Sequence, residues 1–574
     1  MSWTLKKKYL DLLAHEEGYH QKLWGECFSV CLAYPNTYRT GISNLGFQTI
    51  YALINRHEHF LCERTFLPDP EDEDYFAQGY APLFSLESQK PLSDFDIVAF
   101  SVSYENDYPN ILKILDMSRI SLNAFQRKES EPLIIGGGIA VTLNPEPITD
   151  FFDLFFIGEG EEVLSEFLQI FSASAKANHA RDEMLLRVQE AVEGAYAPRF
   201  YNIHYQSNHL IEKIEPIKPS LPKRIIKRWV RDINAFPTDQ CISTANAEFG
   251  ELHLTEVSRG CRRGCRFCAA GYVCGPARFR NVEVLAPSFL RGIEKQKTIG
   301  LLGTAVSDHP ELYSMYDNIR TKNGKLSMGS LRLDRIDSKM AILLKETGIE
   351  TVALAPEAGS QRLRDVIKKG ISEEHILNAV ECLTDFGIVN IRLYFMVGLP
   401  TETDEDIDAA IHLVKRIKHH AIKHSGGKTT FRRITLSVNQ FIPKPVTPFQ
   451  WHPLEETGVV RKRISRIKNA LLRDKSIKII HDLPKWNYIQ ALLSLGDRQV
   501  GKILLSVHRN GGNWSRTFKE VNVNPDFYVY RLKNIAEILP WDVIDHGVSK
   551  EHLISEFNKS LSHQRVESGY PGLF

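Results

Sequence analysis

The most informative stretch of the chain is Val257–Cys268, which reads Val-Ser-Arg-Gly-Cys-Arg-Arg-Gly-Cys-Arg-Phe-Cys. It places Cys261, Cys265 and Cys268 at the spacing Cys-x3-Cys-x2-Cys, and such thiolates can share one iron–sulfur cluster if a short loop curls around it. A glycine precedes each of the first two cysteines and favours the curl, since glycine accepts backbone angles that other residues avoid. Three ligands leave one iron of a four-iron cluster open. An open iron is a reaction site, whereas four thiolates make an electron carrier.

These residues resemble the signature of the radical SAM superfamily, Cys-x3-Cys-x-aromatic-Cys, with Phe267 at the aromatic position and Arg259-Gly260 in front of it. The resemblance implies that a 4Fe-4S cluster chelates S-adenosylmethionine (SAM) through its open iron. One electron from the cluster would then cleave SAM and release a 5′-deoxyadenosyl radical. The alternative is a structural zinc site. Zinc requires four ligands, usually as two separated Cys-x2-Cys pairs, and Cys274 would have to complete such a set.

Length and composition indicate a soluble protein of several domains. A chain of 574 residues is too long for one hydrophobic core, so two to four domains are expected. The net charge of +1 gives no overall attraction to nucleic acid or membrane. No apolar run approaches the ~20 residues that span a bilayer, and no signal-peptide core is present. Nine mostly scattered cysteines do not indicate a disulfide framework, so we predict a cytoplasmic protein without membrane association.

Residues 1–171 are predicted to form an α/β domain. Short apolar strands at Cys27–Pro35, Asp96–Ser103, Pro132–Gly138 and Leu154–Ile157 alternate with helical segments. This alternation indicates a doubly wound parallel sheet, whose ligands bind at the carboxyl ends of the strands.

The order and loop types of this domain resemble the cobalamin-binding domain that precedes many radical SAM cores. Ser101 and Ser103 match the serines after its third strand, and Gly136, Gly137 and Gly138 match the glycines that let a corrin or its nucleotide tail approach the backbone. The motif Asp-x-His-x-x-Gly, whose histidine replaces the lower cobalt ligand, is missing, as it is in many cobalamin-binding radical SAM members. The alternative is a domain of the same shape that serves packing or substrate binding.

Residues 172–250 are predicted to be a linker or crossover segment, with a β-like stretch at Tyr201–Tyr205. Three prolines lead into the basic run Lys223–Arg231, which includes Trp229. Basic residues interleaved with an aromatic one can contact an RNA backbone. A solvated crossover strap accounts for the same run.

Residues 251–450 repeat a strand-then-helix unit about six times, fewer than the eight that close a full barrel. After a strand from about Leu252, the strand candidates are Ile299–Asp308, Lys325–Asp334, Glu350–Ser360, Asn390–Pro400 and Ile434–Pro443. We therefore expect a partial (βα)6 barrel, the fold that the radical SAM resemblance implies. Its site would lie at the carboxyl ends of the strands.

The candidate SAM-binding residues lie in the cluster motif or near these strand ends. They are Phe267, Gly303, Ser330, Arg332, Glu357, Ser360 and Gly398. A carboxylate such as Glu357 can accept from the amino group of SAM, and Arg332 can pair with its carboxylate. Glu357-Ala358-Gly359-Ser360 also resembles a Glu-x-Gly-Ser element of the superfamily, and Gly398–Thr403 resembles its Gly-Leu-Pro-x-Glu-Thr element. The alternative for each is a capped loop or a buried ion pair.

Residues 451–574 are predicted to be mainly helical. The segment Val459–Leu472 combines an apolar stripe with five basic residues. It is most simply a surface helix packed on the core, and a site for a phosphate-bearing substrate is the alternative.

Phrases across the chain, such as Asn144–Pro147, Pro443–Trp451 and Leu539–Asp542, resemble an uncharacterised group of radical SAM proteins with an N-terminal cobalamin-binding-like domain. The resemblance implies a radical SAM enzyme with a 4Fe-4S cluster, SAM and cobalamin. Its reaction would be cobalamin-assisted methyl transfer to an unreactive carbon, and a flavodoxin or ferredoxin would supply electrons. The alternatives are cobalamin-independent radical modification of RNA or protein, and a non-catalytic iron–sulfur sensor.

Overall fold

The computed structural model describes residues 2–295, 297–329, 331–427 and 431–562. Contacts divide the chain into two compact units, and neither is continuous in sequence. The N-terminal unit comprises Met1–His253, Leu492–Tyr528 and Ala536–Gly547, and the core unit comprises Leu254–Ala491, Val529–Ile535 and Val548–Phe574. The predicted segments 1–171, 172–250, 251–450 and 451–574 do not follow this division, because parts of 451–574 belong to each unit.

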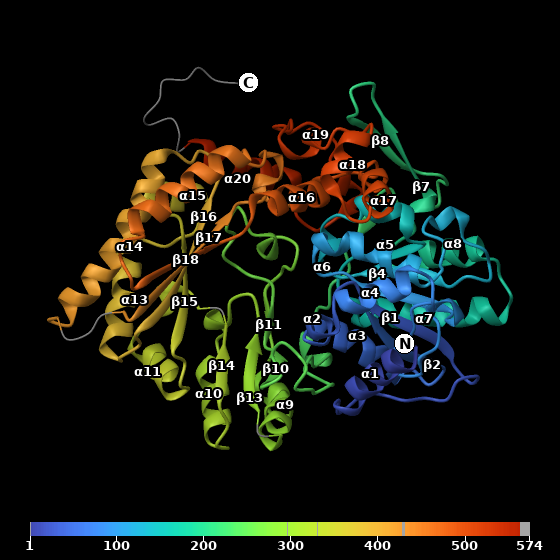
Figure 1. The fold of residues 1–574 in the computed structure, drawn as a ribbon, viewed down its shortest axis with the longest axis horizontal. Coiled ribbons are helices and arrows are strands. Elements are labelled where there is room, and N and C mark those ends of the chain that lie inside the picture. Colours follow the sequence, from blue (N-terminus) through green and yellow to red (C-terminus); the bar gives the residue numbers. More distant parts are fainter. Residues whose placement is uncertain (1, 296, 330, 428–430, 563–574) are drawn as a thin grey trace. The chain divides into compact units, whose positions relative to one another are not determined.

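A six-stranded sheet forms the centre of the N-terminal unit, in the order β2-β1-β3-β4-β5-β6 (Figure 1). The strands are β1 (Phe28–Tyr34), β2 (Phe60–Phe66), β3 (Ile97–Ser101), β4 (Leu133–Gly137), β5 (Leu154–Phe156) and β6 (Ala195–Tyr196). The first five are parallel, and β6 runs antiparallel to β5. This confirms the predicted doubly wound fold. The strand order reverses between β1 and β3, and such a reversal creates a crevice outside the carboxyl ends of the two strands.

Helices and short paired strands complete this unit. The helices are α1 (Ser2–Ala14), α2 (Tyr38–Ile42), α3 (Leu45–Arg56), α4 (Pro70–Ala77), α5 (Tyr108–Met117), α6 (Ile139–Leu143), α7 (Gly160–Lys176), α8 (Arg181–Ala191), α17 (Val500–Arg509) and α18 (Trp514–Glu520). The antiparallel pair β7 (Tyr201–Tyr205) and β8 (Ile211–Pro216) follows α8. The short strand β9 (Ile225–Ile226) pairs in parallel with β19 (Ile544–Asp545).

Strand β2 was not predicted, because charged residues interrupt its apolar pattern. Arg64 on this strand is fully buried between Glu16 and Glu87, at 2.6 and 2.7 Å. The paired carboxylates make that burial tolerable, since a buried charge without a partner is strongly destabilising. From the sequence alone, a charged residue such as Arg64 indicates a surface segment, because its partners are far away in the sequence.

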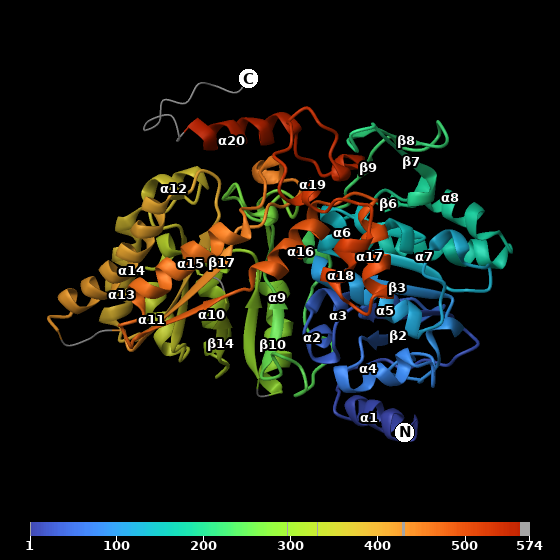
Figure 2. The same cartoon turned by 45° about the horizontal axis from the view of Figure 1, so that its top comes forward.

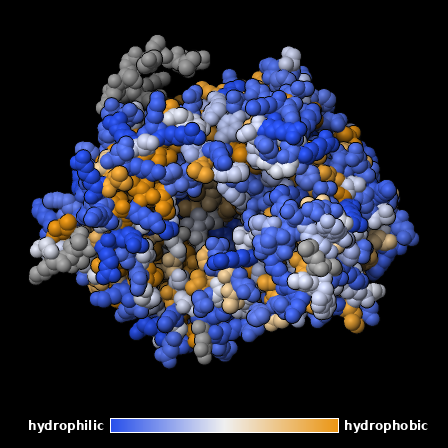
Figure 3. Space-filling model, viewed as in Figure 1, coloured by the Kyte–Doolittle hydropathy of each residue, from blue (hydrophilic) through white to orange (hydrophobic). Residues whose placement is uncertain are grey.

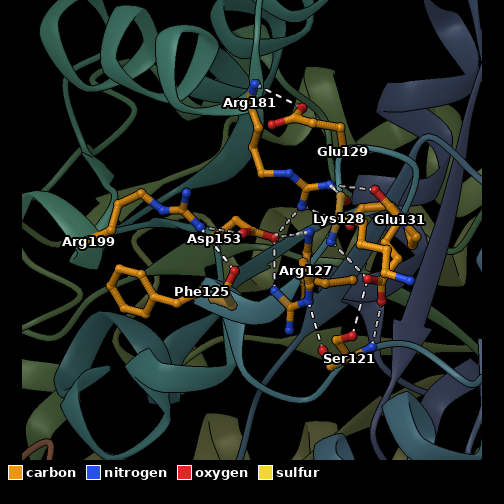
Figure 4. A network of polar contacts seen from close by, with 12 residues as sticks. Ser121, Phe125, Arg127, Lys128, Glu129, Glu131, Asp153, Arg181 and Arg199 are labelled. Carbon is orange, nitrogen blue, oxygen red and sulfur yellow. Dashed lines mark hydrogen bonds and ion pairs between the residues drawn. The ribbon is translucent and has the colours of Figure 1, made fainter.

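A second buried network centres on Asp153, which directly precedes β5 (Figure 4). Asp153 accepts from Arg127 at 2.9 Å, from Arg199 at 3.0 Å and from Arg181 at 3.4 Å. Backbone carbonyls take up further N–H groups of the same arginines. The network ties the loop before β4 to β5 and α8, so we interpret it as part of the scaffold.

The chain returns to the N-terminal unit after residue 491. The amide of Asn144 donates to the carbonyls of Ser494 and Gly496, at 3.1 and 2.8 Å. Arg498 donates to Glu146 at 3.1 Å, and α17 packs against α5. These buried polar contacts explain why the segment from Leu492 packs in the same unit as a sheet whose strands all lie before residue 197.

The basic run Lys223–Arg231 is engaged within the N-terminal unit. Arg228 pairs with Glu162 and Glu166 of α7, at 3.0 and 2.7 Å. Arg224 donates to the carbonyls of Asp542 and Ile544. These contacts support the strap interpretation of the run over RNA contact.

The core unit contains two main sheets (Figure 1). One has the order β10-β13-β14 and the other the order β15-β16-β17-β18. The strands are β10 (Leu252–Glu256), β13 (Thr298–Leu302), β14 (Leu326–Met328), β15 (Thr351–Glu357), β16 (Asn390–Val397), β17 (Arg433–Gln440) and β18 (Ile477–His481). Strands β15 to β18 are all parallel, as are β13 and β14. The six predicted strands are present, and β18 is an addition in a region predicted to be mainly helical.

Helices follow these strands in the alternating pattern that the sequence predicted. They are α9 (Val282–Glu294), α10 (Leu312–Arg320), α11 (Ser338–Glu346), α12 (Gln361–Val366), α13 (Glu373–Asp385), α14 (Asp404–His424), α15 (Thr457–Leu471) and α20 (Lys550–Ser562). The apolar stripe of α15 is buried in the core through Val460, Ile464, Ile467 and Leu471. Helices α16 (Pro484–Leu495) and α19 (Asp526–Val529) lie where the chain passes from one unit to the other.

Among the described residues, no helix combines the length and apolar character needed to cross a bilayer. The face of the molecule in Figure 3 is largely hydrophilic, with hydrophobic side chains scattered among polar ones.

Candidate functional site

The cluster motif lies on a loop held at its base by two short antiparallel strands, β11 (Ser258–Arg259) and β12 (Arg278–Phe279). Gly260 has φ +75°, and a Cβ there would stand 2.5 Å from the carbonyl oxygen of Cys274. The loop therefore closes on itself at a point where only glycine fits. Gly264 also has positive φ, at +65°, as expected for a backbone that curls around a bound group.

The thiols of Cys261, Cys265 and Cys268 are close enough to influence one another electrostatically. Burial raises the pKa of the Cys265 and Cys268 thiols. Backbone N–H groups of Ala270 and Gly271 point at Cys268 and favour its thiolate. Iron binding would displace the thiol protons, because metal ligands bind as thiolates.

The chemistry of the donor set fits an iron–sulfur cluster. Cysteine thiolates are the ligands that hold such clusters in proteins, and three of them leave one iron of a four-iron cluster open. A structural zinc ion would need a fourth ligand beside these three cysteines.

Phe267 and Glu357 both lie near the ammonium of Lys369, a residue that was not predicted from the sequence. The ammonium of Lys369 lies 5.8 Å from the centre of the Phe267 ring and 3.0 Å from the Glu357 carboxylate. Its charge also favours the thiolate of Cys265. Lys369 was missed because it lies in the turn after α12, without a recognisable motif around it.

Glu357 ends β15 with φ +67°, in the left-handed region. A non-glycine residue there costs about 1–3 kcal/mol and is often found at functional sites. The pairing of β15 with β16 also shifts register between Leu354 and Glu357. The backbone thus bends at the carboxyl end of the strand, where a SAM ligand was predicted.

The remaining predicted SAM residues differ in what they contact. Arg332 pairs with Asp334 at 2.9 Å, and Ser330 lies outside the described residues. Gly303 follows β13, and a Cβ there would stand 2.4 Å from the hydroxyl oxygen of Ser258 in β11, so a side chain at this position would oblige that hydroxyl to move. Ser360 accepts from the N–H of Leu363 at 3.1 Å and caps α12. Its hydroxyl also contacts Asp406. Ser360 therefore has the role of a helix cap, which was the alternative to SAM binding at this position.

Gly398 lies in a loop that is stabilised by a hydrogen bond to Glu402 and by the ion pair of Glu402 with Arg463. The N–H of Gly398 donates to the Glu402 carboxylate at 2.7 Å, and Arg463 of α15 donates to the same carboxylate at 2.9 Å. Burial raises the pKa of Glu402 to about 8, although both donors oppose that shift. Arg463 was predicted as part of a basic surface, and the structure shows it buried and paired instead.

The five predicted cobalamin contacts come together at the carboxyl ends of β3 and β4. Ser101 lies opposite Gly137 in the register, and Ser103 accepts from Asn44 at 3.2 Å. A Cβ on Gly136 would stand 2.8 Å from the ring of Phe152, and one on Gly138 would stand 2.4 Å from the carbonyl oxygen of Val102. Gly137 differs, because the nearest atom to its Cβ position is 3.8 Å away. Packing thus explains Gly136 and Gly138, while the backbone at Gly137 has space beside it.

An alternating α/β core with three cysteines on one loop after its first strand has the organisation expected of an iron–sulfur enzyme with one open iron. Family models agree with that class: "Radical SAM proteins, N-terminal" matches residues 46–198, and "Radical SAM superfamily" matches residues 255–414. The chain belongs to the radical SAM superfamily. Its cofactors are accordingly a 4Fe-4S cluster and SAM, and it requires a reductant.

Known proteins resemble the chain over different lengths. An uncharacterised protein of Methanocaldococcus jannaschii is 30% identical over 481 residues, covering 83% of this chain and 90% of that protein. An uncharacterised methyltransferase of Pyrococcus horikoshii is 25% identical over 293 residues, and the match covers 50% of this chain and 58% of that protein. Among solved structures, the radical SAM methyltransferase TsrM from Kitasatospora setae, with cobalamin and a 4Fe-4S cluster bound, has 13% identity and a TM-score of 0.47. That match covers 72% of this chain and 75% of the TsrM chain.

Proposed function

We propose that Cys261, Cys265 and Cys268 hold the 4Fe-4S cluster and that the enzyme transfers a methyl or related group to an unreactive carbon. The single observation that supports the cluster assignment is that the three thiols interact electrostatically on one loop, which closes at Gly260 against the Cys274 carbonyl. Group transfer is supported by the Pyrococcus relative, which is named a methyltransferase. Bound to the loop, the reduced cluster would supply one electron for cleavage of SAM to methionine and a 5′-deoxyadenosyl radical.

The residues around the loop provide groups for holding SAM. The Glu357 carboxylate can accept from the amino group of SAM, and Lys369 beside it fixes where that carboxylate stands. Arg332 can pair with the SAM carboxylate if it exchanges Asp334 for that partner. The loop at Gly398, which Glu402 and Arg463 stabilise, would border the adenosyl group. The Gly-Leu-Pro-x-Glu-Thr element has this place in the superfamily.

We propose further that the N-terminal unit binds cobalamin at the carboxyl ends of β3 and β4. The space beside Gly137 supports this proposal, as does the reversal of strand order between β1 and β3, since doubly wound sheets bind ligands at such a reversal. A flavodoxin or ferredoxin is the proposed electron donor. Radical modification of RNA or protein without cobalamin is the second candidate.

Anaerobic reconstitution with iron and sulfide tests the proposal. The wild-type protein should bind about four irons per chain, as a 4Fe-4S cluster requires. With SAM and dithionite it should release 5′-deoxyadenosine, measured by liquid chromatography. The variant Cys265→Ala should form neither the cluster nor the nucleoside. Cluster formation without any 5′-deoxyadenosine would favour the iron–sulfur sensor, and corrinoid uptake by the wild type separates the two enzymatic candidates.

A further inference from the structure

The C-terminal helix α20 reaches the cluster loop through one carboxylate, that of Glu556. This side chain is only 4% exposed. One of its oxygens accepts from Arg266 at 3.2 Å and from Lys368 at 3.0 Å, and the other accepts from Lys559 at 2.9 Å. All of these residues belong to the core unit, where α20 packs against α12 (Figure 2).

Two of these cations border the proposed cluster site. Arg266 follows Cys265 directly in the motif, and its guanidinium donates to the carbonyls of Asp365 and Val366, at 3.0 and 2.7 Å. The ammonium of Lys368 lies 3.9 Å from the Cβ position of Gly264. One positive charge thus belongs to the cluster loop itself, and the other stands beside it.

Tyr272 interacts electrostatically with Glu556 and with two of the thiols. Its hydroxyl donates to the carbonyl of Gly264 at 3.1 Å. Burial raises the pKa of Tyr272, and the negative charges of Glu556, Cys265 and Cys268 raise it further. One side chain of the loop thus lies within the electrostatic reach of Glu556 and of two cluster ligands.

Other cations around the loop have counter-charges of their own. Arg263 pairs with Asp308 at 2.5 Å, and Lys369 pairs with Glu357 at 3.0 Å. Glu556 is shared by Arg266, Lys368 and Lys559, and these three cations lower its pKa to about 2 against the opposing effect of burial. It is therefore ionised at neutral pH and sets how much of this positive charge the loop experiences.

We propose that Glu556 lowers the reduction potential of the cluster by neutralising Arg266 and Lys368. The inference rests on the proposed cluster site. Reduction adds one electron to the cluster, so positive charge nearby favours the reduced form and negative charge disfavours it. Without the carboxylate the two cations would stabilise the added electron, and the cluster would become a weaker reductant. Glu556 would thus keep the cluster strongly reducing.

A redox titration of the reconstituted protein tests this proposal, with dithionite as reductant, soluble mediators, and electron paramagnetic resonance to count reduced clusters. In Glu556→Gln the ratio of reduced to oxidised cluster at a fixed potential should rise about tenfold, a midpoint shift of about +59 mV for one electron. The matched control is Glu551→Gln, which removes the same charge from an exposed position on the same helix and should keep the wild-type midpoint.

Two further variants separate charge from structure. Lys368→Gln should shift the midpoint in the opposite direction, because it leaves Glu556 less neutralised. The double variant E556Q/K368Q should return toward the wild-type value. A wild-type midpoint in Glu556→Gln with full iron content would overturn the proposal. If Glu556→Gln retains no iron, an unchanged midpoint in Lys368→Gln would overturn it equally. A wild-type protein that takes up no iron would instead contradict the cluster site itself.

Discussion

Arg463 of α15 and Glu402, which follows β16, form an ion pair of 2.9 Å whose two side chains are 10% and 1% exposed. The carboxylate also accepts the N–H of Gly398 at 2.7 Å. One arginine on a helix that looks like a surface element therefore holds the backbone loop proposed to border the adenosyl group.

Arg463→Leu should release that loop. Above about pH 8, where Glu402 is ionised, breaking this buried pair costs about 3–5 kcal/mol, because the carboxylate loses its partner. The pKa of Glu402 would rise further above about 8 without the guanidinium, so the loss should grow as the pH increases past that value. Hydrogen exchange of the Gly398 amide measures the effect directly. Arg461→Leu, which removes an exposed arginine from the same helix, should leave that amide protected.

Replacing Cys261, Cys265 or Cys268 with Ala should abolish the 4Fe-4S cluster, while Cys274→Ala should retain it. The Cys274 residue contributes its backbone carbonyl to the loop closure at Gly260, and an alanine keeps that carbonyl. Iron and sulfide analysis after anaerobic reconstitution checks both parts. Loss of iron from Cys274→Ala alone would show that the ligand assignment is wrong.

Glu357→Ala should keep the cluster but weaken SAM binding. Removing a charge-assisted hydrogen bond costs about 1.5–3 kcal/mol, which is roughly ten- to a hundredfold in affinity. Equilibrium binding of SAM to the reconstituted variant measures this change. Glu374→Ala, at an exposed position on α13, serves as the control and should bind SAM as the wild type does. An unaltered affinity in Glu357→Ala would exclude this carboxylate from the site.

Gly137→Leu should block corrinoid loading and leave the iron content unchanged. The nearest atom to the Cβ position of Gly137 is 3.8 Å away, so the fold itself tolerates a Cβ there. A leucine would nevertheless occupy the space proposed for the nucleotide tail. Gly137→Ala is the matched control and should retain at least part of the uptake. Hydroxocobalamin binding, followed by absorption spectroscopy, measures the difference, and a wild type that binds none would exclude the cobalamin-dependent reaction.

The N-terminal unit should lose stability as the pH falls from about 6.5 to about 4. Burial lowers the pKa of His546 to about 4, and its ring contacts the carbonyl of Thr142 at 2.8 Å. Between those two pH values the unfolded chain binds a proton that the folded unit does not, so protonation favours unfolding. A shift of this size corresponds to about 3 kcal/mol. Urea unfolding of wild type and His546→Gln at pH 7 and pH 5 should show a smaller pH dependence in the variant.

The parts of the site that depend on local sequence could be predicted. The cysteine spacing and the glycines of the cluster loop act within a dozen residues, so their pattern already indicates the curl. The doubly wound sheet was also predictable, because its buried parallel strands are short apolar runs that end in small residues. Strand β2 was missed, since the charge of Arg64 is explained only by Glu16 and Glu87.

The electrostatic surroundings of the loop could not be predicted, because their residues are far apart in sequence. Glu556 lies 290 positions from Arg266, and Arg463 lies 61 positions from Glu402. Neither Glu556 nor Arg463 lies in a recognisable sequence motif. Ser360 illustrates the opposite problem, because a serine at a strand end suits both a SAM contact and a helix cap, and the structure uses its hydroxyl for the cap.

The discontinuous N-terminal unit has a consequence for how the protein is made. Its sheet emerges first from the ribosome, but Asn144 and Glu146 meet their partners only when the segment beginning at Leu492 has been synthesised. The intervening segment Leu254–Ala491 takes roughly 10–50 seconds to translate at about 5–20 residues per second. During that interval the surface that α17 will cover is exposed, and the cluster loop is already outside. The N-terminal unit therefore closes late in synthesis, and expression of residues 1–253 alone would yield a unit that lacks α17, the helix that packs against α5.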